Sequence, residues 1–321
     1  MSKVSIILPS YNKKKYIPET ISSVLQQTHQ NIELIIIDDN STDGTRGYLH
    51  ELQKKEGCNP KIKVIINNEN LGANHRRNQG LGLATGEYVI FLDADDILAQ
   101  TCVEQRVSVM RKSSDIDFAV FAMGIFVKKP GDNKISWASH SKKPLVDFLR
   151  HELPWQTMQP IWKKDVVLKT GGFDEAFQRL QDVEFHTRVL FDENVKFKLF
   201  PTIIDCYYRI DEDRKNYDMY NFLLMRTKSS IQYYNKYNNL SQQHGLGKKI
   251  CGTIFQTYIN LFHYRRVNKI DHKQFLYLEE LLLSGSGQSA KVLFKVLRVV
   301  NLSFLHKIKG VNFLLFKLIT D

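Results

Sequence analysis

The hydrophobic positions of the first hundred residues form short β-branched runs separated by helical patterns. Four runs lack strict alternation, as is typical of strands covered on both faces: Val4–Leu8, Glu33–Ile37, Lys63–Ile66 and Tyr88–Leu92. Between them, apolar residues spaced along one face predict helices ending near residue 28 and spanning 42–56 and 74–84. This alternation predicts an α/β fold whose mostly parallel central sheet is flanked by helices.

Conspicuous polar residues follow three of the four predicted strands. They are Pro9-Ser-Tyr-Asn12, Asp38-Asp-Asn-Ser-Thr-Asp43 and Asp93-Ala-Asp-Asp96. Because ligands of parallel sheets bind at the carboxyl ends of the strands, we expect these residues to converge on one crevice. The second segment can equally form a turn and a helix N-cap, since Asp, Asn and Ser satisfy free amides there.

Capping does not account for the third segment. In an extended chain Asp93 and Asp95 point the same way, so two carboxylates stand side by side and need a compensating cation or ligand hydroxyls. A divalent metal that holds a diphosphate meets that need. A dinucleotide-binding fold is not expected, because the glycines of Gly80-Leu-Gly-Leu-Ala-Thr-Gly86 have the wrong spacing and precede a strand instead of following one.

Four motifs follow one another along the first hundred residues. They are Ser5-Ile-Ile-Leu-Pro-Ser-Tyr-Asn12, Ile36-Ile-Asp-Asp-Asn-Ser-Thr-Asp-Gly-Thr45, Asn70-Leu-Gly-Ala73 with Arg77-Asn78, and Gly86-Glu-Tyr-Val-Ile-Phe-Leu-Asp-Ala-Asp-Asp96. In order and spacing they resemble the motifs of family-2 glycosyltransferases. The close resemblance covers roughly the first hundred residues, and a looser one continues to about residue 215. It implies a GT-A fold, a nucleotide-diphosphate sugar as donor, inverting transfer, and Mg²⁺ or Mn²⁺ as cofactor.

The resemblance also implies roles for matching residues. Pro9, Tyr11 and Asp39 fall where the family holds the base, usually uracil, so a UDP-sugar is the expected donor. Asp93 falls where the ribose or donor is contacted, and Asp95 falls on the metal-binding aspartate of the DxD motif.

One arginine of these motifs has two open roles. Arg77 matches an arginine near the diphosphate, but it can equally form an ion pair that holds the 93–96 loop. Asp96 is expected to support that same loop.

A later segment resembles the family's acceptor-side motif. Gly171-Gly-Phe-Asp-Glu175 is followed by a stretch in which Gln181 replaces the usual Glu and Asp182 stands on the catalytic base. Inverting transfer needs one carboxylate to accept the proton of the acceptor hydroxyl. The alternative for Asp182 is a helix cap, and Glu184 is the reserve candidate because Gln181 departs from the pattern.

Two further features of this region stay open. Trp155 and Trp162 suit either a platform for sugar C–H surfaces or core packing. In many relatives a His follows the Tyr-Arg pair and helps bind metal or diphosphate, whereas here Asp211 or a neighbour stands there. The second metal ligand is therefore undefined.

The net charge of +11 divides the 321 residues into two parts. Residues 220–321 carry 15 Lys and Arg against 4 Asp and Glu, whereas residues 1–219 carry 30 of each. We expect a GT-A catalytic domain over 1–217, with a nucleotide-sugar half (1–97) and an acceptor half (98–217), followed by a basic helical region over 218–321. Helical patterns there span 219–237, 248–266 and 272–283, with a longer segment from residue 289.

That last segment is a basic amphipathic pattern with Lys291, Lys295, Arg298 and Lys309 near one face. Two interpretations are open: a helical cap that packs on the catalytic domain or a second subunit, and peripheral attachment to an anionic membrane surface. Because the charge is not spread over the chain, no nucleic-acid partner is expected.

The four cysteines form no CxxC pair, which predicts neither a zinc site nor a disulfide framework and suits a reducing cytosol. No secretion signal is expected. The longest apolar stretch is ten residues, 118–127, about half of what a membrane-spanning helix needs. The expected location is the cytoplasm, with the inner face of the cell membrane as the site of peripheral attachment.

These observations together predict a hexosyl- or N-acetylhexosaminyltransferase acting on a glycan acceptor, such as a lipid-linked glycan of the cell envelope. A nucleotidyltransferase is the first rival, but it should carry a Gly-rich basic phosphate loop where Pro9–Asn12 stands. The second rival is a non-catalytic glycan-binding or scaffold protein on the same fold. The intact Asp39, Asp95 and Asp182 disfavour it.

Overall fold

The computed structural model describes residues 2–56, 61–210, 218–286 and 311–320. The chain packs as two compact units. The first comprises Met1–Ser141, Pro154–Ala176 and Arg188–Glu212, and the second comprises Lys142–Leu153, Phe177–Thr187 and Asp213–Asp321. The expected domain boundary at residue 217 and the division at residue 97 remain predictions.

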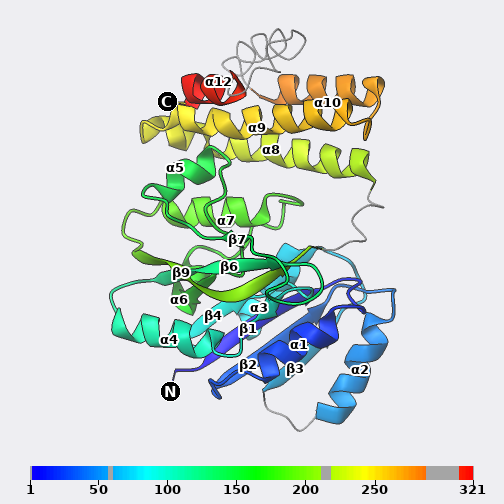
Figure 1. The fold of residues 1–321 in the computed structure, drawn as a ribbon, viewed down its shortest axis with the longest axis vertical. Helices are drawn as coiled ribbons and strands as arrows, with labels where there is room; N and C mark the ends of the chain where they lie inside the picture. The colour runs from blue at the N-terminus through cyan, green and yellow to red at the C-terminus, as the bar shows by residue number, and fades with distance from the viewer. Residues whose placement is uncertain (1, 57–60, 211–217, 287–310, 321) are drawn as a thin grey trace. The chain divides into compact units, whose positions relative to one another are not determined.

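The first unit is built on a mixed sheet (Figure 1). Its described strands are β1 (Val4–Ser10), β2 (Ile32–Asp38), β3 (Ile62–Ile66), β4 (Tyr88–Phe91), β5 (Ile97–Leu98), β6 (Phe118–Phe126), β7 (Ser136–Trp137), β8 (Pro160–Lys163) and β9 (Phe197–Arg209). Their order is β3-β2-β1-β4-β8-β6-β9-β5, with β7 paired to β6. The first four in this order are parallel, and β8 is antiparallel to both of its neighbours. The four strands predicted in the first hundred residues and the α/β class are confirmed.

Helices cover both faces of this sheet. Those wholly in the first unit are α1 (Ile17–Leu25), α2 (Thr45–Glu56), α3 (Ala73–Leu83), α4 (Cys102–Lys112) and α6 (Lys164–Lys169). The apolar side of α1 joins the cluster formed by the even-numbered residues of β1, such as Ile6 and Leu8. On the opposite face, a Cβ added at Gly80 of α3 would lie 2.5 Å from a methyl carbon of Ile7. That glycine therefore serves close helix–sheet packing, not phosphate binding.

One predicted pair of strands is a single strand in the structure. The pattern predicts strands over 196–200 and 203–209, but β9 runs through both and pairs in parallel with β6. Its register shifts because Phe200 lies opposite Phe121 while Ile204 lies opposite Ala122. The intervening residues include Pro201, which has no N–H to donate to a ladder, so a bulge absorbs them.

A buried ion pair joins β9 to α4. Arg106 donates from Nε and Nη2 to the two carboxylate oxygens of Asp205, at 2.8 and 2.7 Å, and from Nη1 to the carbonyl of Met158. The side chains of the pair are 0% and 1% exposed. Such bidentate pairing satisfies both charges and fixes the strand relative to the helix.

A second buried carboxylate holds the amino ends of the strands in the first unit. Glu33 of β2 accepts hydrogen bonds from the Ser5 hydroxyl of β1 and from the backbone N–H of Thr85, and it pairs with Lys3. Burial raises the pKa of Glu33, but the hydrogen bonds from Ser5, Lys3 and Thr85 outweigh it and lower the pKa from 4.5 to about 2.

This carboxylate should give the first unit an acid-sensitive component of stability. A depressed pKa stabilises the folded state above the unfolded value of 4.5, and that contribution is lost as the pH falls through about 2. We expect Glu33→Gln to lower the free energy of unfolding by about 1–3 kcal/mol at pH 7, with the difference from wild type shrinking below pH 4.5. Urea unfolding between pH 7 and 2.5 measures this. An equal difference at both ends of the range would contradict it, and Glu51→Gln, at an exposed position of α2, is the matched control.

The second unit is helical. Its described helices are α5 (Pro144–Leu149), α7 (Gln181–Leu190, whose last three residues belong to the first unit), α8 (Met219–Gln243), α9 (Gly247–Arg266), α10 (His272–Gly285) and α12 (Val311–Thr320). The three predicted helices after residue 218 are confirmed, with α8 extending beyond its predicted end. The segment carrying Lys291, Lys295, Arg298 and Lys309 lies outside the described residues. None of the helices in the described part of the chain has the length and hydropathy needed to cross a membrane.

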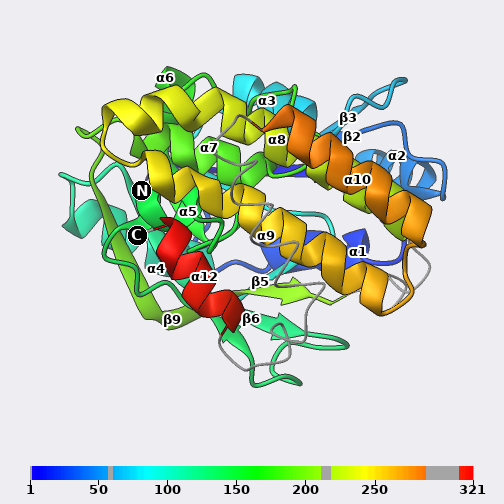
Figure 2. The same ribbon diagram turned by 90° about the horizontal axis from the view of Figure 1, so that it is seen from above.

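The last helix packs within the second unit. Figure 2 shows α12 crossing α9, and the ring of Phe316 lies 5.3 Å from that of Phe255. Arg150, just after α5, stacks on Phe316 and donates to the hydroxyl of Thr320. Leu314 and Leu318 of the same helix are 60% and 76% exposed. One side of α12 is thus held by the unit, while Leu314, Lys317 and Leu318 are exposed.

Candidate functional site

The candidate donor site lies where three parallel strands of the first unit end. Ser10 of β1 is in register with Asp38 of β2, and Phe91 of β4 is in register with Ile7 of β1. The polar segments that follow these strands therefore emerge at one edge of the sheet, as the sequence predicts. Tyr11, Asp39, Asp93 and Asp95 all belong to this unit.

The first of these segments presents an aromatic ring. Pro9 is buried in β1 opposite Ile37, which fixes the strand end. Tyr11 follows the strand and is 47% exposed. Asn12 adopts a left-handed backbone with φ 52° and accepts from the N–H of Thr42. The turn thus ties the end of β1 to the 38–43 segment that follows β2. The ring of Tyr11 is left exposed and can stack on a ligand.

The Asp38–Asp43 segment combines the two roles that its sequence leaves open. Asp38 accepts from the N–H and the hydroxyl of Ser41, and Asp43 accepts from the N–H and the hydroxyl of Thr45, the first residue of α2. These two carboxylates shape the turn and the start of the helix. Asp39, in contrast, contacts the loop before α3.

Asp39 is buried and holds the loop before α3. It accepts from the N–H groups of Leu71 and Gly72, at 2.9 and 2.8 Å, and from Nε of Arg76 at 2.6 Å. A carboxylate offers about four acceptor directions, so these three donors leave capacity for one more. The Asn70-Leu-Gly-Ala73 motif is thus anchored to the end of β2.

Each aspartate of the DxD pair carries a cation. Arg77 donates from Nη2 to Oδ1 of Asp93 at 2.7 Å, and Lys13 donates from Nζ to Oδ2 of Asp95 at 2.5 Å. The Asp93 side chain is 46% exposed, whereas that of Asp95 is 13% exposed. Both carboxylates are therefore paired with cations from other elements, which offsets the repulsion between the two negative charges.

The third carboxylate of this loop has a supporting position. Asp96 is buried and accepts from the backbone N–H of Arg209 at 2.9 Å, while Nε of Arg209 donates to the carbonyl of Asp95. Burial raises the pKa of Asp96 well above its ordinary value, and the carboxylates of Asp95 and Asp93 raise it further. The end of β9 thereby fixes the loop between β4 and β5.

The Gly171–Glu175 motif packs on the helix that carries Arg77. Asn78 of α3 donates to the carbonyl of Phe173 and accepts from its N–H, and the Phe173 ring lies under the Arg77 guanidinium. Gly172 has φ +67°, and a Cβ there would meet Oδ1 of Asn78 at 2.4 Å. The glycine is therefore required by backbone conformation and by close approach. Asn78 and Phe173 position Arg77, a contribution that local sequence patterns do not reveal.

The carboxylate oxygens at the strand ends suit a divalent cation that takes its other ligands from the phosphates of a substrate. Within the described ranges, no group of three or more His, Cys, Asp and Glu side chains could hold a metal ion. Mg²⁺ is usually bound through one or two carboxylates plus substrate phosphates instead of an all-protein cage. Asp93 and Asp95, each already holding a cation, supply that kind of incomplete oxygen set.

The two candidate bases belong to the second unit, in the first turn of α7. Asp182 is half-buried, and its Oδ1 accepts from the N–H of Val183. Glu184 is fully buried and accepts from Nζ of Lys236 and from the hydroxyl of Tyr237, both at 2.7 Å. Glu184 is thus engaged in joining α7 to α8, which makes Asp182 the better candidate for exchanging a proton.

Trp155 and Trp162 do not form a sugar platform. Their side chains are 0% and 1% exposed, and Phe118 stacks on Trp162 with ring centroids 4.1 Å apart. The interpretation as acceptor contacts is wrong for both, because the apolar cluster around β6 covers their faces. Asp211 lies outside the described residues.

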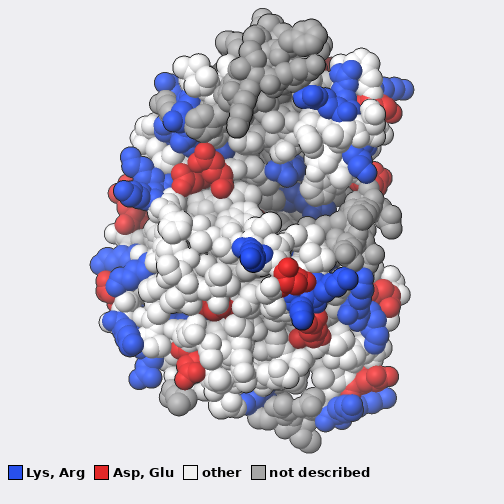
Figure 3. Space-filling model, viewed as in Figure 1, with Lys and Arg blue, Asp and Glu red and all other residues white. Residues whose placement is uncertain are grey.

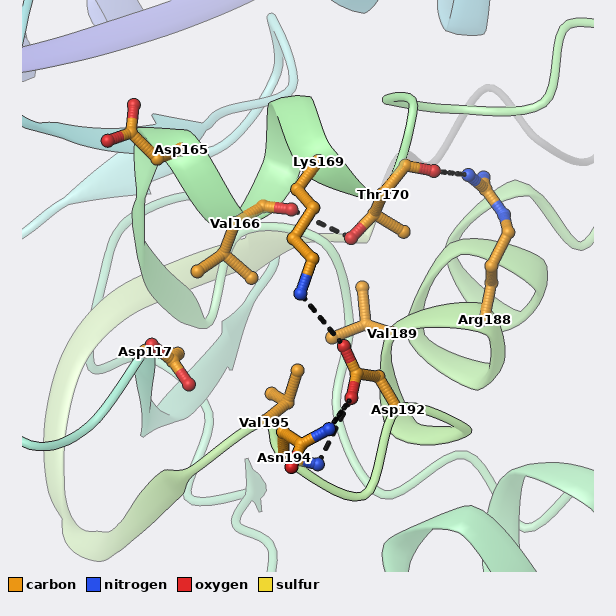
Figure 4. A pocket seen from close by; sticks show the side chains of 10 residues that line it. All are labelled: Asp117, Asp165, Val166, Lys169, Thr170, Arg188, Val189, Asp192, Asn194 and Val195. Atoms are coloured by element: carbon orange, nitrogen blue, oxygen red, sulfur yellow. Dashed lines mark hydrogen bonds and ion pairs between the residues drawn. The ribbon is translucent and has the colours of Figure 1, made fainter.

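A separate hollow of about 380 Å³ lies in the first unit, around α6 and the end of α7 (Figure 4). Several of its polar side chains have partners within it: Lys169 pairs with Asp192, Asn194 donates to Asp192, and Arg188 donates to the carbonyl of Thr170. None of the predicted site residues lines it. We assign it no part in donor binding.

Two similar proteins act in bacterial glycan synthesis according to their names. The chain is 44% identical over 111 residues to the putative teichuronic acid biosynthesis glycosyltransferase TuaG of Bacillus subtilis, covering 35% of this chain and 43% of TuaG. It is 41% identical over 111 residues to the UDP-Glc:alpha-D-GlcNAc-diphosphoundecaprenol beta-1,3-glucosyltransferase WfgD of Escherichia coli, covering 35% and 42%. The chain spans about two fifths of the length of the relatives it matches first.

A solved structure resembles nearly the whole chain. The mannosyltransferase PcManGT from Pyrobaculum calidifontis, in complex with GDP-Man and Mn²⁺, has a TM-score of 0.58 at 16% identity and covers 98% of this chain and 85% of its own. That likeness confirms the GT-A fold. The sequence profile described as Glycosyl transferase family 2 matches residues 5–173. With more than half of its length matched and the family's motifs at the strand ends, the chain belongs to glycosyl transferase family 2.

Proposed function

We propose that the protein is an inverting, metal-dependent glycosyltransferase that moves a sugar from UDP to a glycan. One observation carries the proposal: an exposed ring and two carboxylates, those of Tyr11, Asp93 and Asp95, gather at the carboxyl ends of β1 and β4. This is where open α/β sheets bind nucleotides.

The donor is held through its base, ribose and diphosphate. Tyr11 stacks on the base, and the remaining acceptor direction of Asp39 receives a ring N–H, with Pro9 shaping the strand end beneath. Asp93 contacts the ribose, and Arg77 offsets diphosphate charge. UDP-Glc appears in the name of WfgD, which supports uracil as the base and a hexosyl group as the sugar. An N-acetylhexosaminyl group is the alternative.

Asp95 would hold Mg²⁺ or Mn²⁺ together with the diphosphate. When bound, such an ion stabilises the negative charge that develops on the leaving diphosphate. Mn²⁺ accompanies the donor in the structure of PcManGT, which supports a divalent cofactor here.

Asp182 acts as the general base. As the acceptor oxygen forms a bond to the sugar's C1, the bond from C1 to the diphosphate oxygen breaks and its electron pair leaves with the nucleotide. Asp182 takes the hydroxyl proton in the same step. Attack opposite the leaving group inverts the configuration at C1.

The acceptor is proposed to be a lipid-linked glycan of the cell envelope, made at the cytoplasmic face of the membrane. The diphosphoundecaprenol acceptor in the name of WfgD and the teichuronic acid in that of TuaG support this class. The test is incubation with UDP-Glc or UDP-GlcNAc, Mn²⁺ and a polyprenyl-diphosphate-linked GlcNAc. We expect a β-linked product from these α-linked donors, and an α-linked product would overturn inversion.

We propose peripheral membrane attachment through the C-terminal helices. On the face drawn in Figure 3, described Lys and Arg side chains are interspersed with Asp and Glu, so the structural argument rests on Leu314 and Leu318 of α12, which are exposed together with Lys317. Leu314 and Leu318 can enter the headgroup region, and each nearby Lys or Arg adds about 1 kcal/mol on an anionic surface.

Vesicle co-sedimentation tests this attachment. The full chain should pellet with anionic vesicles at low salt and much less at high salt, because surface charge is screened. Leu314→Gln with Leu318→Gln should reduce pelleting without disturbing Phe316, which packs on α9. Absence of pelleting with anionic vesicles at low salt would favour the helical-cap interpretation.

A further inference from the structure

The two cations on the DxD pair are held in very different ways. The Arg77 side chain is 5% exposed, rests on the Phe173 ring and donates from Nη1 to the amide oxygen of Asn74. The Lys13 side chain is 27% exposed and reaches Asp95 from the loop after β1. Arg77 is a fixed part of the site, whereas the ammonium of Lys13 is the more movable cation.

The backbone of Lys13 is nevertheless fixed. Its N–H donates to the hydroxyl of Thr45 at 3.0 Å, and the preceding Asn12 is tied to Ser41. Only the flexible stem can therefore swing, and its tip stays within reach of the space beside Asp95. Lys13 is thus a tethered cation on the carboxylate that is proposed to hold the metal.

We propose that Lys13 couples metal binding to donor binding, by holding Asp95 when the site is empty and pairing with the donor's diphosphate when the metal takes its place. This role rests on the proposed function. A divalent ion that binds without a nucleotide must displace the ammonium of Lys13 from Asp95. It then lies beside the positive side chains of Lys13 and Arg77. A diphosphate alone meets the carboxylates of Asp93 and Asp95, so each ligand is bound weakly without the other.

When both ligands bind, the charges of the metal and the diphosphate largely cancel. The ammonium of Lys13, released from Asp95, then pairs with the diphosphate. The binding of one ligand therefore strengthens the binding of the other by the same factor. Lys13 is in this account a positioning residue for the diphosphate and a competitor of the metal.

Isothermal titration of the full chain tests this with Mn²⁺ and UDP as the probes. In Lys13→Gln we expect Mn²⁺ alone to bind about tenfold more tightly than in wild type, and UDP at saturating Mn²⁺ to bind about tenfold more weakly. Because the affinity for UDP alone should change little, reciprocity makes these the same change, and the factor by which UDP tightens Mn²⁺ binding should fall about tenfold. Lys13→Arg should keep most of the coupling.

Lys14→Gln is the matched control, because it removes the same charge one residue along. Its Nζ lies 4.8 Å from the centre of the Tyr48 ring, and the variant should bind both probes as wild type does. Unchanged Mn²⁺ affinity in Lys13→Gln, or equal effects in the two variants, would overturn the proposal. If wild type with Mn²⁺ fails to bind UDP at all, the proposed function itself fails, and this role fails with it.

Discussion

Asp95→Asn should abolish Mn²⁺-dependent UDP binding and reduce turnover by at least about 10²-fold. The substitution keeps the shape of the side chain but removes the charge that the metal and Lys13 need. Metal-ion stabilisation of a leaving group is worth several kcal/mol, and each 1.36 kcal/mol is about tenfold in rate. Titration of Mn²⁺ in the presence of UDP and a donor-consumption assay measure the two effects.

The fold should survive this change, because asparagine keeps the size of the side chain and the cation left behind, Lys13, is 27% exposed and can turn to solvent. Asp115→Asn, at an exposed position of the first unit, removes the same charge away from the strand ends. It should leave both measurements unchanged. Wild-type turnover that persists in excess EDTA would contradict the assignment of Asp95.

Asp182→Asn should leave donor binding intact and reduce transfer by roughly 10² to 10⁴, the usual contribution of a positioned general base. Asparagine preserves the size of the side chain and the hydrogen bond from Val183, but it cannot accept a proton. Single-turnover rates with saturating donor report the chemical step, and UDP titration reports donor binding.

Glu184→Gln separates catalysis from stability in the same helical turn. Because Glu184 is buried between Lys236 and Tyr237, its neutralisation should cost about 1–3 kcal/mol of folding stability while the chemical step survives. Normal transfer by Asp182→Asn together with loss of transfer in Glu184→Gln would show that the base stands two residues later.

The first four strands could be read from the sequence because burial on both faces leaves a local signature, whereas their order in the sheet could not. The runs at Val4–Leu8 and Glu33–Ile37 are continuous and β-branched, and nearly every residue of β1 and β2 is buried. Because parallel strands have their carboxyl ends at the same edge of the sheet, parallel pairing alone predicts that the segments after them lie together. The grouping of Tyr11, Asp93 and Asp95 follows from that rule.

The partners of these residues could not be read in the same way. The contacts of Asp39 with Arg76 and of Asp95 with Lys13 join segments 37 and 82 residues apart, and no local pattern specifies them. The burial of Trp155 was equally hidden, because an aromatic ring suits a core and a sugar platform alike. For β9, Pro201 signals a break, whereas the partner strand β6 tolerates a bulge and keeps the strand continuous.

The carboxyl ends of β1, β2 and β4 are proposed to bind a nucleotide diphosphate together with a divalent metal. The most direct test is the thermal unfolding of the full chain with UDP, GDP or ADP, each with and without Mn²⁺. A ligand at 100 times its Kd stabilises the native state by about 2.7 kcal/mol. We predict a rise in Tm of a few degrees for UDP with Mn²⁺ and much smaller shifts for either alone or for ADP. Identical Tm values with every nucleotide, with and without Mn²⁺, would contradict the account.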